Sequence, residues 1–312
     1  METVPDSNGG VSDKYWPEVR ARLLDIHNTR LEEMDKSGIE LTILSLNPAP
    51  AIQAIPDVNK AIEVSKRAND YLAGEIAKNP KRFAGFAALP MQDPDAAAAE
   101  LHRCVEDLGF IGILVNGYTQ IHTEDSSYYY DLPQYWPFWA EVEKLDMPFY
   151  LHPRVSLKSQ RKIYEGHEQL LQSSWGFSVE TATHALRLMG SGLFDAYPGL
   201  NIILGHFGEM LPSNIWRTTH RLAVVPQEKR YKRPFSEYLT NNFYVTTSGN
   251  YRMSPLLTAM MEMGSDRIMF STDFPFETLE ESADWFDNVE IGETERLKIG
   301  RLNAVRLFKL NI

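Results

Sequence analysis

The sequence is poor in cysteine and lacks long apolar runs. Its 312 residues include one cysteine, Cys104, so no disulfide can form within the chain, which fits a reducing compartment. No apolar run is long enough to cross a bilayer, and the start of the chain has neither the basic flank nor the apolar core of a secretory signal. These absences argue against a disulfide scaffold and a membrane-spanning protein, and they predict the cytoplasm as the location.

Positive charge is also scarce. Lys and Arg total 31 against 42 Asp and Glu, which gives a formal net charge of -11. An acidic protein repels nucleic-acid phosphates and anionic membranes, so neither is expected as a partner. A small anionic substrate is still allowed, because a local arginine or a metal ion can reverse the field inside a pocket.

What the chain does contain is an alternation of apolar, β-rich runs with amphipathic helical patterns, which is typical of parallel β/α units. One helical pattern begins after Asp93, which can cap it, with Pro94 suited to the first turn and Gly109 to the stop. Other helices are expected at 61–78, 132–146, 177–190, 252–263 and 295–308. The runs that read as strands are 41–47, 83–90, 111–117, 148–153, 201–208, 243–249 and 267–275.

These seven strands are one fewer than a closed (β/α)₈ barrel of the TIM type needs. The first 18 residues are polar and irregular, and they offer no strand. Two architectures therefore stay open: an open, doubly wound sheet, or a barrel whose chain starts after the first strand. A barrel of this length counts as one domain, so residues 1–312 are expected to form a single domain.

Polar side chains end three of the apolar runs: His152, His206 and Asp273. The carboxyl ends of barrel strands surround one mouth, where catalysis occurs. Two imidazoles and a carboxylate meeting there could bind a divalent metal. Each residue also has a simpler interpretation: a histidine at a strand end is usually only hydrogen-bonded, and Asp273 could cap the following helix, since Pro275 follows closely.

The segment GHFGEMLP adds a second polar group. His206 and Glu209 are three residues apart across a turn from strand to helix, so the carboxylate could fix the tautomer of the imidazole and support its protonated form. Alternatively, Glu209 lies at a helix start only as a capping acid. Arg217 follows on a helical pattern and could bind a substrate carboxylate, although a lone arginine is more often in a surface ion pair.

Four aromatic residues lie in the loops near these strand ends: Trp175, Phe177, Phe274 and Phe276. Together they could form an apolar box around an aromatic ring. Taken singly, most aromatic side chains in such positions are ordinary core residues.

The motifs FYLHP, ILGHFGE, TTSGN and FSTDFPFE, in this order and with these spacings, resemble the aromatic-acid decarboxylase branch of the amidohydrolase superfamily. The γ-resorcylate (2,6-dihydroxybenzoate) decarboxylases are the most similar group, and the 2,3-dihydroxybenzoate and salicylate decarboxylases are more distant. The similarity extends over nearly the whole chain and includes ILSLNPAP, LVNGY, YYDLPQYWPFW and IGRLNAVRLFKL.

The resemblance implies a (β/α)₈ barrel, one divalent metal (zinc or manganese) and the nonoxidative decarboxylation of an ortho-hydroxybenzoate to a phenol and CO₂. It also implies a homodimer or homotetramer whose partner is a small aromatic carboxylate. The roles implied for individual residues are metal binding by His152 and Asp273, proton donation by Asp273, support of the reaction by His206 with Glu209, and substrate binding by Arg217, Phe177 and Phe276.

The chain departs from this family at its start. Family members begin with a strand that ends in a Glu-x-His-like or Glu-x-Ala-like metal motif, and METV aligns just after it. This implies a missing strand, one or two missing metal ligands, and unpaired edges on both neighbouring strands. Three explanations stay open: a shortened gene prediction or fragment, a replacement strand from elsewhere, or a non-catalytic protein, including one that pairs with a full-length homologue. A metal-dependent hydrolase of a lactone or amide is the competing activity.

Overall fold

The structure is a computed structural model that describes residues 14–47, 49–225 and 230–312. In these residues seven parallel strands form one sheet in the order β1 to β7, each paired with the next along the chain. A doubly wound sheet reverses its strand order at a switch point, and this one does not. The barrel alternative is therefore confirmed, as a curled half-barrel. The strands are β1 (Thr42–Leu44), β2 (Phe83–Ala88), β3 (Gly112–Asn116), β4 (Phe149–His152), β5 (Ile202–Leu204), β6 (Phe243–Thr246) and β7 (Ile268–Met269).

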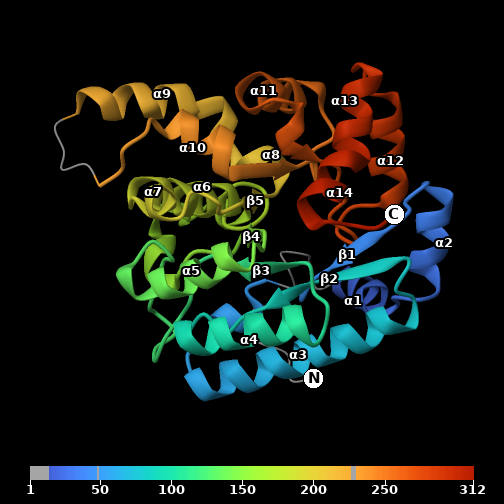
Figure 1. Cartoon of the computed structure of the whole chain (residues 1–312), viewed down its shortest axis with the longest axis horizontal. Helices are drawn as coiled ribbons and strands as arrows, with labels where there is room; N and C mark the ends of the chain where they lie inside the picture. Colours follow the sequence, from blue (N-terminus) through green and yellow to red (C-terminus); the bar gives the residue numbers. More distant parts are fainter. Residues whose placement is uncertain (1–13, 48, 226–229) are drawn as a thin grey trace.

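Helices connect successive strands and cover the outside of the sheet (Figure 1). The α-helices are α1 (Trp16–Leu24), α2 (Thr29–Lys36), α3 (Val58–Lys78), α4 (Pro94–Glu106), α5 (Trp136–Lys144), α6 (Gly176–Gly190), α7 (Leu193–Ala196), α8 (His206–Glu209), α9 (Leu211–Val224), α10 (Phe235–Asn242), α11 (Met253–Met263), α12 (Leu279–Asn288), α13 (Glu293–Leu297) and α14 (Asn303–Phe308). Each helical pattern of the sequence corresponds to helical structure, whereas α1, α2, α7, α8, α10 and α12 were not among the expected helices.

Alternation along each strand separates two layers of core. On β5, Ile202 and Leu204 face the large outer core beneath the helices, whereas Ile203 belongs to a smaller inner cluster. The same alternation places Leu114 of β3 and Tyr244 of β6 in the inner cluster. Successive side chains of a strand point to opposite faces, so runs that are apolar on both faces are those buried on both sides.

The helix predicted after Asp93 is α4, and its start is as expected. The Asp93 carboxylate accepts hydrogen bonds from the backbone N–H groups of Asp95 and Ala96, and Pro94 occupies the first helical position. Gly109 lies just beyond this helix with φ of +68°, a left-handed conformation that glycine adopts without strain.

Three sequence predictions need correction. The helix predicted over 295–308 is interrupted by a π-helical turn, η6 (Lys298–Leu302), between α13 and α14. The strand predicted over 201–208 ends at Leu204, because the chain then enters a left-handed turn. The start predicted to be irregular contains α1 from Trp16 onward, while its first 13 residues lie outside the described residues.

Strands β1 and β7 form the two edges of the sheet. The segments beside these edges come together: the guanidinium groups of Arg22 and Arg30 lie over the ring of Phe274 at 5.0 and 4.7 Å, and Arg301 pairs with Glu40 at 3.1 Å. Contacts between segments at the two ends of the chain thus draw the half-barrel together, although no strand of the described residues joins β1 to β7.

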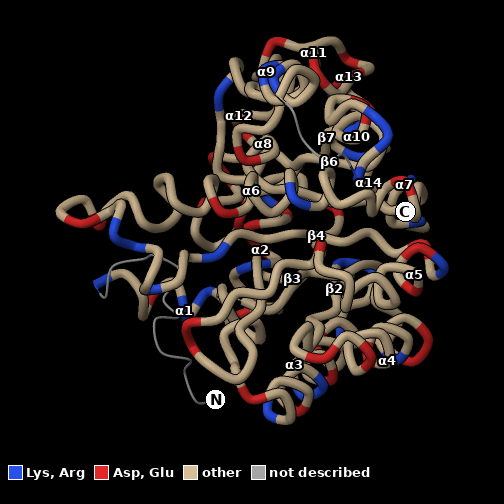
Figure 2. The backbone as a smooth tube through the Cα atoms, turned by 90° about the vertical axis from the view of Figure 1, so that its left-hand side faces the viewer, with Lys and Arg blue, Asp and Glu red and all other residues tan. Residues whose placement is uncertain are grey.

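The charged residues lie mainly on the outer helices, and α3 and α5 carry both signs (Figure 2). No helix in the described part of the chain is both long and apolar enough to span a membrane.

Candidate active site

A cavity of about 620 Å³ opens at the carboxyl ends of the strands. This volume lies in the range of small-molecule sites. Residues that follow β1, β4, β5, β6 and β7 contribute to its wall, as expected for the catalytic mouth of a barrel. The wall of the cavity includes Tyr15, Asn47, His152, Phe177, His206, Glu209, Gly249, Asn250, Asp273, Phe276 and Glu277.

The backbone after β5 forms an unusual left-handed turn. His206, Phe207, Glu209 and Met210 have φ between +50° and +69°, and Gly208 has φ of +79°. Each non-glycine residue in this conformation costs roughly 1–2 kcal/mol. Strain of this kind is found where surrounding structure holds a functional side chain in place. Here the turn brings His206 and Glu209 together, and Asp273 after β7 also has a positive φ of +64°.

His206 lies between two carboxylates. Its Nδ1 is 2.5 Å from Glu209 Oε1, and its Nε2 is 3.7 Å from Asp273 Oδ2. Burial alone would lower the pKa of His206, but the attraction of Glu209 and the interactions with Asp273 outweigh burial and raise the pKa well above its ordinary value. A carboxylate near each ring nitrogen therefore favours the protonated form of His206.

The Glu209 side chain, which contacts His206, is fixed by burial and by a hydrogen bond to α6. Its carboxyl group is almost fully buried, and its second oxygen accepts a hydrogen bond of 2.6 Å from the Ser178 hydroxyl of α6. The following helix α9 has no side-chain cap. The interpretation of Glu209 as a capping acid is therefore wrong.

Asp273 does not cap a helix either. Thr278 is the N-cap of α12, and its side chain accepts a hydrogen bond from the backbone N–H of Glu281. A Cβ atom at Gly249 would lie 3.2 Å from His206 Cδ2 and 3.7 Å from Asp273 Oδ2, and Gly249 has φ of +62°. Glycine in the TTSGN motif therefore lets this loop approach both side chains closely.

His152, at the end of β4, is neutral, and a hydrogen bond to the backbone of the next residue orients its ring. Its Nδ1 lies 2.9 Å from the carbonyl oxygen of Pro153, which can only accept, so Nδ1 carries the proton and Nε2 keeps a lone pair. Burial, together with the positive charge of His206, lowers the pKa of His152 despite the opposing effect of Asp273. A neutral imidazole with one free nitrogen is the form that binds metal ions.

Phe177, at the start of α6, and Phe276, after β7, both contribute to the cavity wall, as the aromatic box required. The other two aromatic residues do not line it. Phe274 lies beneath the arginines of α1 and α2, and Trp175 is 47% exposed.

Arg217 is not brought to this cavity. Its side chain is exposed on α9, outside the residues that form the wall. Sequence reasoning missed Tyr15, Asn47, Asn250 and Glu277, which line the cavity. For Asn47 a signal was available, since it ends the apolar run 41–47 just as the histidines end theirs.

The donor set for a metal is partial. The cavity holds one neutral imidazole, His152, and one carboxylate, Asp273, that suit zinc or manganese. Within residues 14–47, 49–225 and 230–312, no group of three or more His, Cys, Asp or Glu side chains is arranged to hold a metal ion. Part of the coordination shell must therefore come from elsewhere, such as substrate oxygens, water or additional protein ligands.

Comparison with known proteins identifies the family of this chain. The model of the Amidohydrolase family matches residues 14–310. The chain belongs to this family. It is 60% identical to the γ-resorcylate decarboxylase of Rhizobium radiobacter, over 99% of this chain and 95% of that protein. The family resemblance of the motifs is confirmed.

Solved structures of similar proteins share the fold. A 2,6-dihydroxybenzoate decarboxylase complexed with 2,6-dihydroxybenzoate has a TM-score of 0.95 and 58% identity, covering 98% of this chain and 96% of the other. A dihydroxybenzoic acid decarboxylase from Polaromonas sp. JS666, with bound manganese and the inhibitor 2-nitroresorcinol, has a TM-score of 0.94 and 57% identity, covering 97% and 92%.

Proposed function

We propose that this amidohydrolase is a carboxy-lyase, which converts an ortho-hydroxybenzoate, with 2,6-dihydroxybenzoate as its substrate, to a phenol and CO₂ in a reaction that depends on a divalent metal. The observation that carries the proposal is the position of His206 between Glu209 and Asp273, in one cavity with His152 and two phenylalanine rings. The similarity to decarboxylases of 2,6-dihydroxybenzoate and to a manganese-bound structure supports the choice of substrate and metal.

Two residues are proposed as metal ligands. His152 offers Nε2, because the Pro153 carbonyl occupies the opposite nitrogen, and Asp273 offers a carboxylate oxygen. A divalent metal held by these groups would supply positive charge that offsets the negative charge of a bound hydroxybenzoate. His206 is not assigned as a ligand, because both of its nitrogens face carboxylates.

The proposed reaction exchanges a carboxylate for a proton. Asp273, protonated in the complex, transfers its proton to the ring carbon that bears the carboxylate, and the ring loses aromaticity at this step. The bond to the carboxyl carbon then breaks, its electron pair restores the aromatic ring, and CO₂ leaves. His206 lies 3.7 Å from Asp273, and the neighbouring Glu209 raises its pKa, so it supports the negative charge that develops on the phenolic oxygen or returns a proton.

The proton-donor role is tested by Asp273→Asn. We expect loss of at least about 10²-fold in kcat for CO₂ release from 2,6-dihydroxybenzoate, as for removal of a general acid, with an unchanged circular dichroism spectrum. Bound manganese is measured on the same sample to separate proton transfer from metal binding. The control is Asp266→Asn, a half-exposed acid paired with Lys298. Near-normal turnover by Asp273→Asn contradicts the assignment.

A role of Arg217 in binding the substrate carboxylate stays a prediction. Its exposed side chain lies outside the cavity wall. If the role is correct, Arg217→Gln raises KM for the benzoate, and if Arg217 is an ordinary surface residue, KM does not change.

A non-catalytic protein is the second candidate, because the described residues hold no complete set of metal ligands. Manganese titration of the purified protein by calorimetry distinguishes the non-catalytic protein from the proposed decarboxylase. The absence of binding, together with the absence of CO₂ release in added manganese or zinc, would favour the non-catalytic protein. Hydrolysis of lactones or amides, without CO₂ release, would favour the competing hydrolase.

We further propose that residues 1–312 form one domain, that the chain assembles as a homodimer or homotetramer, and that it resides in the cytoplasm. Exposed aromatic and aliphatic side chains on α9 support the assembly: Trp216 is 68% exposed and stacks on His220, and Val224 is 56% exposed. Light scattering on the purified protein measures the mass, and a monomer at micromolar concentration contradicts this proposal.

A further inference from the structure

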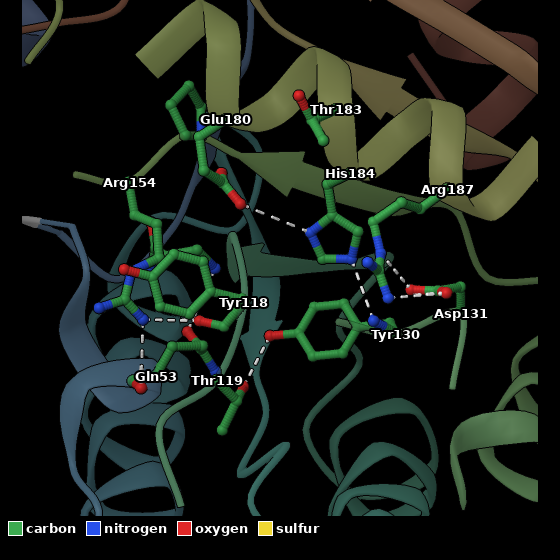
Figure 3. A network of polar contacts seen from close by, with 12 residues as sticks. Gln53, Tyr118, Thr119, Tyr130, Asp131, Arg154, Glu180, Thr183, His184 and Arg187 are labelled. Carbon is green, nitrogen blue, oxygen red and sulfur yellow. Dashed lines mark hydrogen bonds and ion pairs between the residues drawn. The ribbon is translucent and has the colours of Figure 1, made fainter. Parts of the chain in front are cut away.

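Directly behind His152 lies a buried arginine. Arg154 is 3% exposed, and its guanidinium group stacks on the ring of Tyr118 at 3.9 Å. Figure 3 shows the surrounding polar network. Arg154 Nη1 donates to the carbonyl oxygen of Tyr118 at 2.6 Å and to that of Gln53 at 3.4 Å, and Nη2 donates to Gln120 Oε1 at 2.9 Å. We call these four residues the arginine clamp.

The clamp joins the loops that follow four consecutive strands. Gln53 lies in a short 3-10 helix after β1, Tyr118 and Gln120 follow β3, and Arg154 follows β4. The Gln53 amide group also donates to the carbonyl oxygen of Leu89, after β2, and accepts from the backbone N–H of Asn116 at the end of β3. These loops lie on the β1 side of the mouth, where the sheet has an open edge.

The connection from the clamp to His152 is a single peptide unit. The carbonyl that accepts from His152 Nδ1 belongs to the peptide that joins Pro153 to Arg154. Anchoring Arg154 therefore sets the direction of this carbonyl, and the carbonyl sets which ring nitrogen carries the proton. The backbone on either side is anchored as well, since Gly117 N–H donates to the His152 carbonyl and the Tyr118 hydroxyl donates to the Val155 carbonyl.

The backbone at Gly117 approaches the Arg154 side chain too closely for any residue larger than glycine. A Cβ atom at Gly117 would lie 2.4 Å from Arg154 Cγ and 2.9 Å from Glu180 Oε2, and Gly117 has φ of +57°. Three neutral oxygens and a ring hold the guanidinium group, and none of these partners is a carboxylate. Burying a charge in this way is unfavourable before compensation, and apolar residues of similar volume often give equal stability. Stability alone therefore gives no reason for an arginine here.

We infer that Arg154 is a positioning residue, which holds the Pro153 carbonyl so that His152 stays in its Nδ1–H tautomer with Nε2 directed to the cavity. The role of Nε2 as a metal ligand rests on the proposed function, whereas the tautomer is a property of the metal-free protein. The planar fork of arginine is needed because three acceptors in three directions must be reached while the group stacks on a ring.

The test uses the full chain with ¹⁵N-labelled histidine, and it reads the tautomer of His152 by long-range nitrogen–proton correlation in the absence of metal. Variants are Arg154→Met and Arg154→Lys. Arg233→Met is the matched control, because Arg233 also stacks on a tyrosine, at 4.5 Å from Tyr238, and donates to a carbonyl, that of Phe194, away from the cavity. Manganese affinity is then measured by calorimetry on the same proteins.

We expect the wild-type protein and Arg233→Met to show His152 as the Nδ1–H tautomer alone. Arg154→Met is expected to show a mixture of tautomers and to bind manganese at least about tenfold more weakly, as is usual when a group that orients a metal ligand is lost. Arg154→Lys keeps the positive charge but not the planar guanidinium group. Its tautomer ratio is therefore expected to lie between those of the wild-type protein and Arg154→Met. If Arg154→Met does not fold, the lysine variant carries the test.

Wild-type tautomer and wild-type manganese affinity in a folded Arg154→Met or Arg154→Lys protein would overturn the inference. So would a wild-type protein in which His152 is not the Nδ1–H tautomer. If the wild-type protein shows the expected tautomer, and Arg154→Met disturbs it, but no manganese binds, then the inference stands and the proposed function fails.

Discussion

At the scale of single residues, burial decides the charge of Glu180 and His184 on α6. Glu180 Oε1 lies 3.9 Å from His184 Nδ1, the separation of a loose ion pair. Burial, however, raises the pKa of Glu180 to about 8 and lowers that of His184 to about 3. Between these values both groups are neutral, so the contact is not an ion pair at neutral pH.

Glu180 therefore predicts a specific dependence of stability on pH. Its folded pKa of about 8 exceeds the ordinary value of 4.5, so the folded state binds one more proton than the unfolded state between these values. The contribution of Glu180 to the free energy of unfolding should then fall by about 1.4 kcal/mol for each unit that the pH rises in this window. Glu180→Gln removes this contribution, and urea unfolding at pH 5, 6, 7 and 8 measures the difference in slope.

Glu63→Gln is the control for Glu180→Gln, because the Glu63 side chain is 68% exposed. Its slope should equal that of the wild-type protein. Equal slopes for wild-type protein and Glu180→Gln would contradict a protonated Glu180 in the folded state.

At the scale of secondary-structure elements, the left-handed turn from His206 to Met210 is the feature that local patterns do not predict. Apolar periodicity extended the strand through Gly208, but it ends at Leu204. A run of five left-handed residues, of which only Gly208 is a glycine, is unfavourable locally and persists only because contacts from other elements, such as Ser178 with Glu209, hold it.

Two glycine-to-alanine substitutions, one in this turn and one in a helix, test the backbone strain of the turn. A Cβ atom at Gly208 would lie 2.8 Å from Val245 Cγ1 and 3.1 Å from Pro212 Cδ, and φ there is +79°. Gly208→Ala should reduce the free energy of unfolding by at least about 1–2 kcal/mol from backbone strain alone, and it should impair the active site. The matched control is Gly74→Ala within α3, where no atom lies within 4 Å of the added Cβ, so stability should rise by roughly 0.5–1 kcal/mol.

Denaturant unfolding of both alanine variants, with manganese affinity as a second readout, checks this pair. A Gly208→Ala protein as stable as the wild type would show that the turn relaxes without cost, contrary to the strain described above.

At the scale of the whole molecule, the inner cluster ties the end of the chain to strands from across the sheet. Phe308 of α14 is 7% exposed, and its ring lies 5.4 Å from that of Phe86 on β2. The same cluster contains side chains from β3, β5, β6 and β7, so the last helix closes the inside of the half-barrel. Because its members come from widely separated parts of the sequence, its loss should affect the global unfolding transition.

Phe308→Ala is therefore expected to reduce the free energy of unfolding by about 3–5 kcal/mol, the usual cost of a large cavity in a packed core. Met261→Ala serves as the control, since Met261 is 84% exposed and should change stability by less than about 0.5 kcal/mol. Calorimetry measures both. A change of less than 1 kcal/mol for Phe308→Ala would mean that α14 unfolds separately from the sheet.

The sequence by itself determined the family, the order of β/α units and most helices, because these depend on period, composition and motifs that can be read within a short window. It also identified His152, His206, Glu209, Asp273 and the two phenylalanines of the cavity, since strand ends of a barrel meet at one mouth.

Only the tertiary structure decided the left-handed turn, the raised pKa of His206, the exposure of Arg217 and the arginine clamp behind His152. Each of these depends on distances between residues far apart in the chain and on burial, which no local pattern contains. Gln53 and Arg154, for example, are separated by 101 positions and meet only because β1 and β4 end on the same rim.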